Sequence, residues 1–142
     1  MTRMQARRHL SARIAASILD DLDRHARRAG KPRSSLVEQY LAEGLKLDAH
    51  PGIAFVDGPA GRRPVLASHR GLDVWEVVTT LQANDGSVAD TAALLAIPET
   101  EVRVAQSYYR ANRQEIDAWI AANDALATEL AAAWRKEQSA LR

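Results

Sequence analysis

The hydrophobic period of the chain changes abruptly near residue 15, and this change constrains the fold more than any other feature. Residues 8–14 alternate polar and apolar side chains, which is the two-residue period of a strand. The apolar face of this strand holds Leu10, Ala12 and Ile14. From Ile18 to Ala26 the apolar residues recur at helical spacing, until Gly30 ends the helix. The sequence therefore predicts a short strand followed directly by an amphipathic helix.

A second helix is predicted after Lys31, with Pro32, Ser34 and Ser35 suited to its first turn. Its apolar stripe consists of Leu36, Val37, Tyr40, Leu41 and Leu45. A lone strand leaves its backbone donors and acceptors unpaired, and two helices of this size bury too little surface to fold alone. We therefore expect a swapped homodimer in which the strands pair as a two-stranded antiparallel ribbon and four helices share one core.

The charges are divided unevenly along the chain. The net charge is only +1, but residues 1–33 hold nine of the 19 Lys and Arg residues and three of the 18 acidic residues. A basic N-terminal part on an acidic remainder indicates that the first part contacts a polyanion. Ordinary solvated charge is the alternative interpretation, and composition does not decide between the two.

Residues 9–45 resemble the ribbon-helix-helix family of Arc/MetJ-type repressors. The resemblance rests on the strand, the first helix, the turn Gly-Lys-Pro-Arg-Ser and the second helix Leu-Val-x-x-Tyr-Leu-x-x-Gly-Leu. Ala15 and Pro32 depart from the Pro after the strand and the Ser at the second helix cap that are usual in the family. The resemblance implies that the paired strands enter the major groove of operator DNA and that outward side chains touch base edges.

The resemblance also implies which residues contact DNA. They are Arg7 and Arg8 near the phosphates, His9, Ser11 and Arg13 at base edges, and Arg33 and Ser34 where the second helix begins and holds a phosphate. An arginine at the position of Arg13 can contact guanine through two hydrogen bonds. The alternatives are a solvated surface arginine for Arg13 and a strand-edge residue without a role for His9.

The remainder of the chain has a different pattern. Residues 48–71 are rich in Gly and Pro, and the apolar runs 53–56 and 65–67 predict a short hairpin within them. From Asp73 onward the apolar residues recur at helical spacing. The predicted helices cover 73–84, 88–95 behind a capping box at Ser87–Asp90, 99–111, 115–123 and the Ala-rich stretch 124–142.

Residues 50–123 resemble the domain-of-unknown-function family 433. The residues that carry this resemblance are His50–Ile53, Gly58–Arg63, Asp73–Trp75, Tyr108–Tyr109 and Glu115–Asp117. The resemblance implies a small helical bundle of helix-turn-helix type. It also implies an antitoxin that occurs in bacteria beside a PIN-like ribonuclease toxin.

Residues 88–111 have helix-turn-helix spacing and raise the question of a second DNA contact. The helix that would enter the groove starts with Glu99 and Glu101, which would repel phosphate, while Arg103 and Arg110 only partly offset these charges. We therefore expect a module for packing or protein contact here. The aromatic residues Trp75, Tyr108 and Trp119 are expected in its core, and Arg62 and Arg63 either bind phosphate or lie on a solvated hairpin.

The C-terminal stretch has larger apolar residues at a spacing of four. By analogy with the family, antitoxin C-termini wrap the toxin and block its acidic active site. The apolar anchors would be Leu126, Leu130, Trp134 and Leu141, and the cation would be Arg135 or Arg142. The alternative is a helix that packs back on its own domain or across the dimer.

Several classes of function find no support in the sequence. The chain has no cysteine, its four histidines lack metal-ligand spacing, and no Gly-rich phosphate loop follows a strand. We therefore expect no enzyme activity, no metal and no cofactor. No apolar run approaches the roughly 20 residues that span a bilayer, and the N-terminus lacks the apolar core of a signal peptide, so we expect a cytoplasmic protein without a membrane partner.

Together these patterns predict a mainly α protein in three parts. They are a ribbon-helix-helix DNA-binding and dimerisation domain over 1–47, a helical domain with an N-terminal hairpin over 48–123, and a toxin-binding helix over 124–142. The predicted function is that of a type II antitoxin, which binds operator DNA as a homodimer, represses its own transcription and neutralises a PIN-like ribonuclease. The alternative is a stand-alone ribbon-helix-helix transcription regulator whose C-terminal domain mediates higher oligomerisation or another protein contact.

Overall fold

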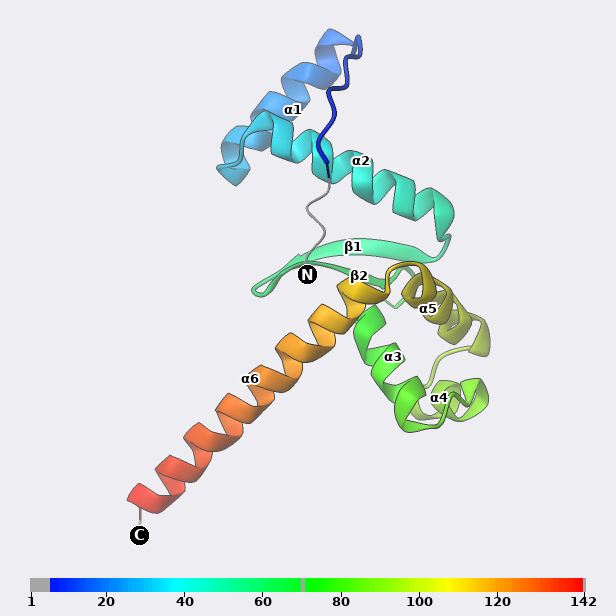
Figure 1. Ribbon diagram of the computed structural model, residues 1–142, viewed down its shortest axis with the longest axis vertical. Coiled ribbons are helices and arrows are strands. Elements are labelled where there is room, and N and C mark those ends of the chain that lie inside the picture. The colour runs from blue at the N-terminus through cyan, green and yellow to red at the C-terminus, as the bar shows by residue number, and fades with distance from the viewer. Residues whose placement is uncertain (1–5, 70, 142) are drawn as a thin grey trace. The chain divides into compact units, whose positions relative to one another are not determined.

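The computed structural model describes residues 6–69 and 71–141, and within them the protein is mainly helical with one two-stranded antiparallel sheet (Figure 1). The elements are α1 (Ala16–Ala29), α2 (Arg33–Ala49), β1 (Ile53–Gly58), β2 (Gly61–Leu66), α3 (Val74–Ala83), α4 (Val88–Leu95), α5 (Glu99–Ala111) and α6 (Arg113–Ala140). The chain divides into two compact units, unit 1 up to Gly44 and unit 2 from Leu45. No helix of the described residues is both long and apolar enough to cross a membrane.

Unit 1 contains α1 and most of α2. Helix α1 ends at Gly30, which has φ 61° in the left-handed region, as the sequence predicts. The amide of Lys31 donates to the carbonyl of Ala26 at 3.1 Å and closes the turn into α2. The buried core of this unit is small and consists of Leu22, Ala26 and Leu36, with Val37 partly buried against it.

The N-terminal strand predicted over 8–14 is not formed in this single chain. Residues 6–15 have neither helix nor strand, and all of them are exposed. The sheet of the described residues lies instead in unit 2, between β1 and β2. The physical reason is that strand backbone needs a hydrogen-bonding neighbour. The prediction is therefore wrong for the single chain, and a ribbon paired between two chains remains a prediction.

Unit 2 begins with the end of α2 and the hairpin. Helix α2 continues to Ala49, two residues beyond the predicted domain boundary, until the chain turns at Pro51. The hairpin was predicted from its apolar runs, and its register pairs Ile53 with Leu66 and Gly58 with Gly61. The turn uses Gly61 at φ 119°, a backbone conformation that other residues adopt only under strain.

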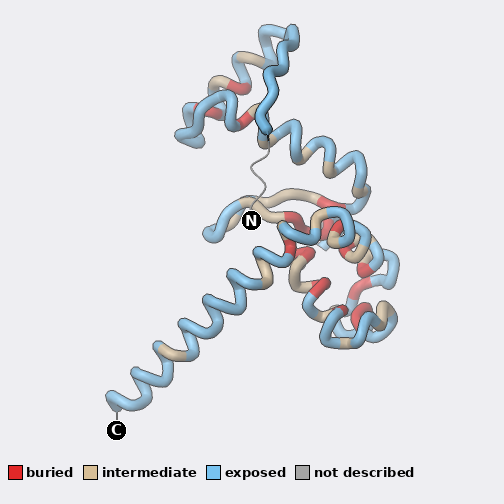
Figure 2. The backbone as a smooth tube through the Cα atoms, in the orientation of Figure 1, coloured by how far each residue is buried: buried red, intermediate tan, exposed pale blue. Residues whose placement is uncertain are grey.

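The core of unit 2 lies where the hairpin, α3, α4, α5 and the start of α6 meet (Figure 2). Tyr108 is fully buried there, as predicted. Trp75 is half-buried and packs against this core. Trp119 is also only half-buried, and it lines a surface groove with Trp75, so its prediction as a core residue is wrong. The Trp119 ring lies beside the hairpin turn at Gly61 and not in the interior of the core, which explains this exposure.

Helix α6 is one continuous helix of 28 residues. The sequence predicts two stretches here, with a boundary between residues 123 and 124, and that boundary is not present in the helix. No Gly or Pro interrupts residues 113–140, and the Ala-rich composition favours helix throughout. Figure 2 shows that only the first turns of α6 reach the core of unit 2, while the remainder is exposed.

Candidate nucleic-acid interface and apolar surfaces

The residues predicted to contact phosphate lie along one groove of unit 1. This groove runs between the N-terminal segment and α2. It is lined by Ala6, Arg7, Arg8, Leu10, Arg33, Ser34, Val37, Glu38 and Leu41. Arg7 and Arg8 come from the segment before α1, whereas Arg33 and Ser34 come from the first turn of α2. Residues about 25 positions apart in sequence therefore contribute cations and a hydroxyl to the same concave surface.

Two carboxylates partly neutralise this groove. The Nη2 of Arg7 lies 3.8 Å from Oε2 of Glu38, and both side chains are largely exposed. The Nη1 of Arg33 donates to Oδ1 of Asp23 at 3.3 Å, which connects α1 with the start of α2. Exposed pairs of this kind contribute only about 0–1 kcal/mol, so both guanidinium groups are free to exchange their partner for a phosphate.

The start of α2 adds backbone donors to the groove. The first amides of a helix have no acceptor within the helix, and the helix dipole places partial positive charge there. The amides of Ser35 and Leu36 donate to the carbonyl of Pro32 at 3.1 and 3.2 Å. The amides of Arg33 and Ser34 precede them and face the same end, which is a suitable place for an anion.

The predicted base-reading residues His9, Ser11 and Arg13 are exposed, and the structure does not bring them into this groove. They lie on the segment that has no regular structure in the single chain. Their grouping therefore depends on whether this segment pairs with another strand.

Unit 1 also exposes many large apolar side chains. Leu10 is 72% exposed and Ile18 is 57% exposed. Ile14, Tyr40 and Leu41 are each more than two-fifths exposed. Unit 1 thus leaves more large apolar side chains in water than it buries, and such a surface marks an interaction site.

The hairpin arginines have carboxylate partners within unit 2. The Nε of Arg63 donates to Oδ1 of Asp73 at 2.7 Å, and Nε1 of Trp75 donates to the other carboxylate oxygen at 2.9 Å. The Nη1 of Arg62 donates to Oδ2 of Asp57 at 3.2 Å. Of the two interpretations left open by the sequence, a structural role in the hairpin fits these contacts better than phosphate binding.

Lys46, Tyr108 and Glu115 form a polar cluster that sequence reasoning missed. The Nζ of Lys46 and the hydroxyl of Tyr108 both donate to Oε2 of Glu115, at 2.6 and 2.9 Å. The ring of His50 packs edge-on against Tyr108 with 5.1 Å between centroids. The sequence motif that includes Tyr108 and Glu115 was the only indication of this cluster. It did not predict the contact with Lys46, which precedes Glu115 by 69 residues.

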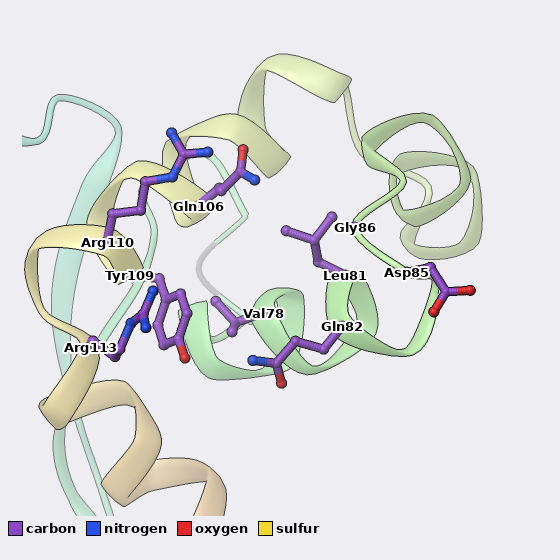
Figure 3. Close-up of a pocket in the computed structure, with 9 residues that line it drawn as sticks. All are labelled: Val78, Leu81, Gln82, Asp85, Gly86, Gln106, Tyr109, Arg110 and Arg113. Carbon is purple, nitrogen blue, oxygen red and sulfur yellow. The ribbon is translucent and has the colours of Figure 1, made fainter.

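A hollow of about 400 Å³ opens beside α5 (Figure 3). It is lined by Val78, Leu81, Gln82, Asp85, Gly86, Gln106, Tyr109, Arg110 and Arg113. The guanidinium carbon of Arg113 lies 5.3 Å from the centre of the Tyr109 ring, and the Tyr109 hydroxyl donates to Oδ1 of Asp117 at 2.8 Å. The bond to this carboxylate raises the pKa of Tyr109 above its usual 10.0.

The predicted anchors of the C-terminal helix are all exposed. Leu130 and Trp134 are each 62% exposed, and Leu126, Leu141 and Arg135 are exposed as well. Arg142 lies outside the described residues. In the described chain α6 does not pack back on its own unit, since every residue from 121 to 141 except Ala132 is exposed. That alternative is therefore wrong for the single chain, whereas packing across a dimer stays open.

A groove where this exposed stretch begins is lined mostly by apolar and aromatic side chains, together with Arg63, Asp73 and Asn123. Its lining residues are Pro59, Ala60, Arg63, Asp73, Trp75, Trp119, Ala122, Asn123 and Leu126. Leu126 thus belongs both to this groove and to the exposed stripe of α6. The groove and the stripe therefore meet at Leu126.

No group of three or more His, Asp or Glu side chains among residues 6–69 and 71–141 could hold a metal ion. No protein-family model, no curated protein and no solved structure matches this chain.

Proposed function

We propose that this protein is a DNA-binding repressor of the ribbon-helix-helix type and the antitoxin of a type II toxin–antitoxin system. The observation that carries the DNA-binding part is the groove that brings Arg7, Arg8, Arg33 and Ser34 together beside the uncovered apolar face of unit 1. The antitoxin part follows the family resemblance of the sequence and is supported by the exposed apolar surface of α6.

Dimerisation follows from the exposed apolar residues of unit 1. A core of three buried side chains is too small for an independent domain, and Leu10, Ile14 and Ile18 are left in water. A second copy would cover these side chains and would give the segment 8–14 a strand to pair with. A symmetric dimer satisfies both needs at once, because each chain supplies the same surface.

DNA binding then places the paired strands in the major groove. A two-stranded ribbon fits this groove, and the outward positions 9, 11 and 13 carry side chains that can donate to base edges. Arg7, Arg8 and the amides at the start of α2 would hold the flanking phosphates. The phosphate contacts orient the ribbon, and the base contacts select the sequence.

The partner-binding part is the distal half of α6. Ile116 and Ile120 face the core of unit 2, and Leu126, Leu130 and Trp134 continue the same apolar side of the helix beyond the core. Twenty residues of helix extend roughly 30 Å, which is enough to cross a groove of another protein. Arg135 and Lys136 follow this stripe and suit a partner with an acidic surface, such as the active site of a PIN-like ribonuclease.

A gel-shift assay tests the DNA-binding part with the full chain and a duplex that covers the promoter of its own gene. Arg13→Ala should weaken binding about tenfold or more, because a bidentate guanine contact contributes about 1–3 kcal/mol of discrimination. Arg24→Ala is the matched control, since Arg24 is an exposed arginine on α1 that pairs with Asp21. Equal affinities for the two variants would contradict the ribbon.

Sedimentation of the full chain tests the dimer. Ile18→Glu should convert a dimer to a monomer, whereas Leu94→Glu should not, because Leu94 is an exposed leucine of unit 2 outside this surface. A monomeric native chain, or a dimer that tolerates Ile18→Glu, would overturn the proposed assembly.

Co-purification with the product of the neighbouring gene tests the antitoxin part. The full chain should bind this protein, and the double substitution Leu130→Asp with Trp134→Ala should abolish binding, with Leu94→Asp as the matched control. If neither the full chain nor a chain ending at residue 123 binds the neighbour, the antitoxin assignment is wrong. A native chain that only forms larger assemblies on DNA would favour the stand-alone regulator.

A further inference from the structure

Helices α4 and α5 of unit 2 form a helix-turn-helix. Helix α4 ends at Ala96, whose φ of 55° lies in the left-handed region, and α5 begins at Glu99 directly after Pro98. The amide of Ile97 donates to the carbonyl of Ala92 at 3.1 Å, and the Ile97 side chain is buried. Helix α3 packs against both helices. The turn is thus short and held in the core, as this motif requires.

The two faces of α5 differ in chemistry. Val102, Ala105 and Tyr108 are buried in the core. The opposite face exposes Thr100, Arg103, Ser107 and Arg110, which follow one another at spacings of three and four. This exposed face carries two guanidinium groups and two hydroxyl groups and no large apolar side chain.

Of the two acidic residues that argue against DNA binding at α5, Glu101 is held by contacts away from the exposed face of the helix. The Glu101 side chain is only 18% exposed, and its Oε2 lies 2.6 Å from Nδ1 of His69. The hydroxyl of Ser68 donates to its other carboxylate oxygen. Glu101 therefore binds the loop before α3 and does not face the exposed side of α5.

The second acidic residue is paired on the surface of the same helix. The Nη2 of Arg103 donates to Oε2 of Glu99 at 3.4 Å. This exposed contact one turn apart contributes only about 0.2–0.5 kcal/mol, so a phosphate can replace the carboxylate. Arg110 and Arg113 take part in none of the ion pairs found among the described residues.

Arg110 and Arg113 lie on the same side of the hollow beside α5, with Arg110 next to Gln106 and Arg113 next to Tyr109 (Figure 3). Asp85 is the acidic residue of this hollow, and Figure 3 shows it on the opposite side, at the turn between α3 and α4. Arg103 precedes Arg110 by seven residues on the same exposed face of α5. Together Arg103, Arg110 and Arg113 form a positive strip, with the Asp117 carboxylate held by the Tyr109 hydroxyl near its end.

We propose that this strip is a second DNA-contacting surface, with the exposed face of α5 against the duplex and Arg113 at a flanking phosphate. Arginines and hydroxyl groups are the side chains that most often contact phosphate and base edges. A protein-binding surface would instead need a buried apolar anchor, which the exposed face of α5 lacks. This surface is separate from the ribbon of the proposed function, and the protein would thus contact DNA through both units.

The test uses the full chain with Arg103→Gln and Arg110→Gln together. The probe is a random-sequence duplex of about 30 base pairs, and its binding is followed by fluorescence anisotropy over a series of salt concentrations. The double variant should bind about tenfold more weakly, and its plot of log affinity against log salt should be shallower by about 1–2, since each lost phosphate contact removes about 0.9. The control is Arg62→Gln, which removes a positive charge of unit 2 that lies on the hairpin and pairs with Asp57, outside α5.

The fold of each variant is verified by tryptophan fluorescence, because all three tryptophans lie in unit 2. Affinity and salt slope equal to those of the control would overturn the second surface. Loss of protein-partner binding with unchanged DNA binding would overturn it as well, because α5 would then be a protein contact.

Arg13→Ala and the α5 variant, both measured on the promoter duplex of the gel-shift assay, separate this inference from the proposed function, because only that duplex reports the base contact of Arg13. If Arg13→Ala weakens binding and the α5 variant does not, the ribbon stands and the second surface is wrong. If only the α5 variant weakens binding, the ribbon assignment fails and the second surface stands.

Discussion

The Nζ of Lys46 lies 2.6 Å from Oε2 of Glu115, and this contact connects the end of α2 with the first turn of α6. The same carboxylate oxygen accepts a hydrogen bond from the hydroxyl of the buried Tyr108. One acidic side chain thus holds a cation and a buried phenol at the edge of the unit 2 core. Unit 2 includes the last turn of α2, because Lys46 on that turn contacts Glu115.

Substitution of Glu115 should therefore destabilise unit 2. Glu115→Ala removes the counter-charge of Lys46 and an acceptor of the Tyr108 hydroxyl, and we expect a loss of about 1–3 kcal/mol in the free energy of unfolding. Urea unfolding followed by tryptophan fluorescence measures this loss. Glu129→Ala on the exposed part of α6 is the control and should stay within about 0.5 kcal/mol of the native chain. An equally small effect for Glu115→Ala would show that the cluster does not stabilise the unit.

The two hairpin arginines form ion pairs of different burial, so the loss of each carboxylate partner should change the free energy of unfolding by a different amount. The Asp73 carboxylate is mostly buried and accepts hydrogen bonds from Arg63 and Trp75, so Asp73→Ala should cost about 2–3 kcal/mol. Asp57 is largely exposed in its pair with Arg62, and Asp57→Ala should cost at most about 1 kcal/mol. Thermal unfolding of both variants measures the difference. Similar losses for the two would contradict the structural role assigned to Arg63.

Two glycines of unit 1 should respond to alanine with opposite sign. Gly30 has φ 61°, so Gly30→Ala forces an alanine into the left-handed region and should cost about 1–2 kcal/mol. Gly44 lies within α2 with nothing within 4 Å of an added Cβ, and Gly44→Ala should stabilise the helix by about 0.5–1 kcal/mol. Circular dichroism during unfolding measures both. A loss of stability for Gly44→Ala would mean that another chain packs closely against this part of α2.

The Tyr109 hydroxyl predicts a loss of stability at alkaline pH. Its bond to the Asp117 carboxylate raises the pKa of Tyr109 in the folded protein, so the folded state holds the phenolic proton more tightly than the unfolded state does. The stability that this bond contributes is present below pH 10.0, the pKa of an unperturbed tyrosine, and is lost as the pH rises through the folded pKa. Asp117→Asn should lower the pKa of Tyr109, which ultraviolet absorbance of the phenolate measures, with Tyr109→Phe as the assignment control. An unchanged titration in Asp117→Asn would disprove this cause.

Local features of the fold could be predicted from the sequence because their causes are local. Gly30 ends α1 since its backbone adopts a conformation that other residues avoid. The runs 53–56 and 65–67 pair as a hairpin because a Gly/Pro turn separates them. The helical periods of α3 to α5 also follow from the spacing of apolar residues. The prediction of Tyr108 as a core residue is confirmed, and it rests on the large apolar area that an aromatic side chain removes from water when it is buried.

The expectations that failed depended on neighbours that the sequence does not name. The strand over 8–14 needs a second strand, and the single chain does not provide one. Trp119 carries the same apolar signal as Ile116, but Ile116 is buried in the core, whereas Trp119 lines a surface groove beside the hairpin turn and is half-exposed. Residues 113–140 form one helix because nothing interrupts them, although their contacts change along the way.

The sequence by itself determined a basic N-terminal module, a Gly-terminated helix pair and a helical second unit, because residue type and spacing act within a few turns of the chain. Only the tertiary structure decided which charges are free. It pairs Arg63 with Asp73, directs Glu101 to Ser68 and His69, and leaves Arg110 on an open face of α5. The physical reason is that the effect of a charge depends on the groups within a few ångströms of it, and those groups come from distant parts of the chain.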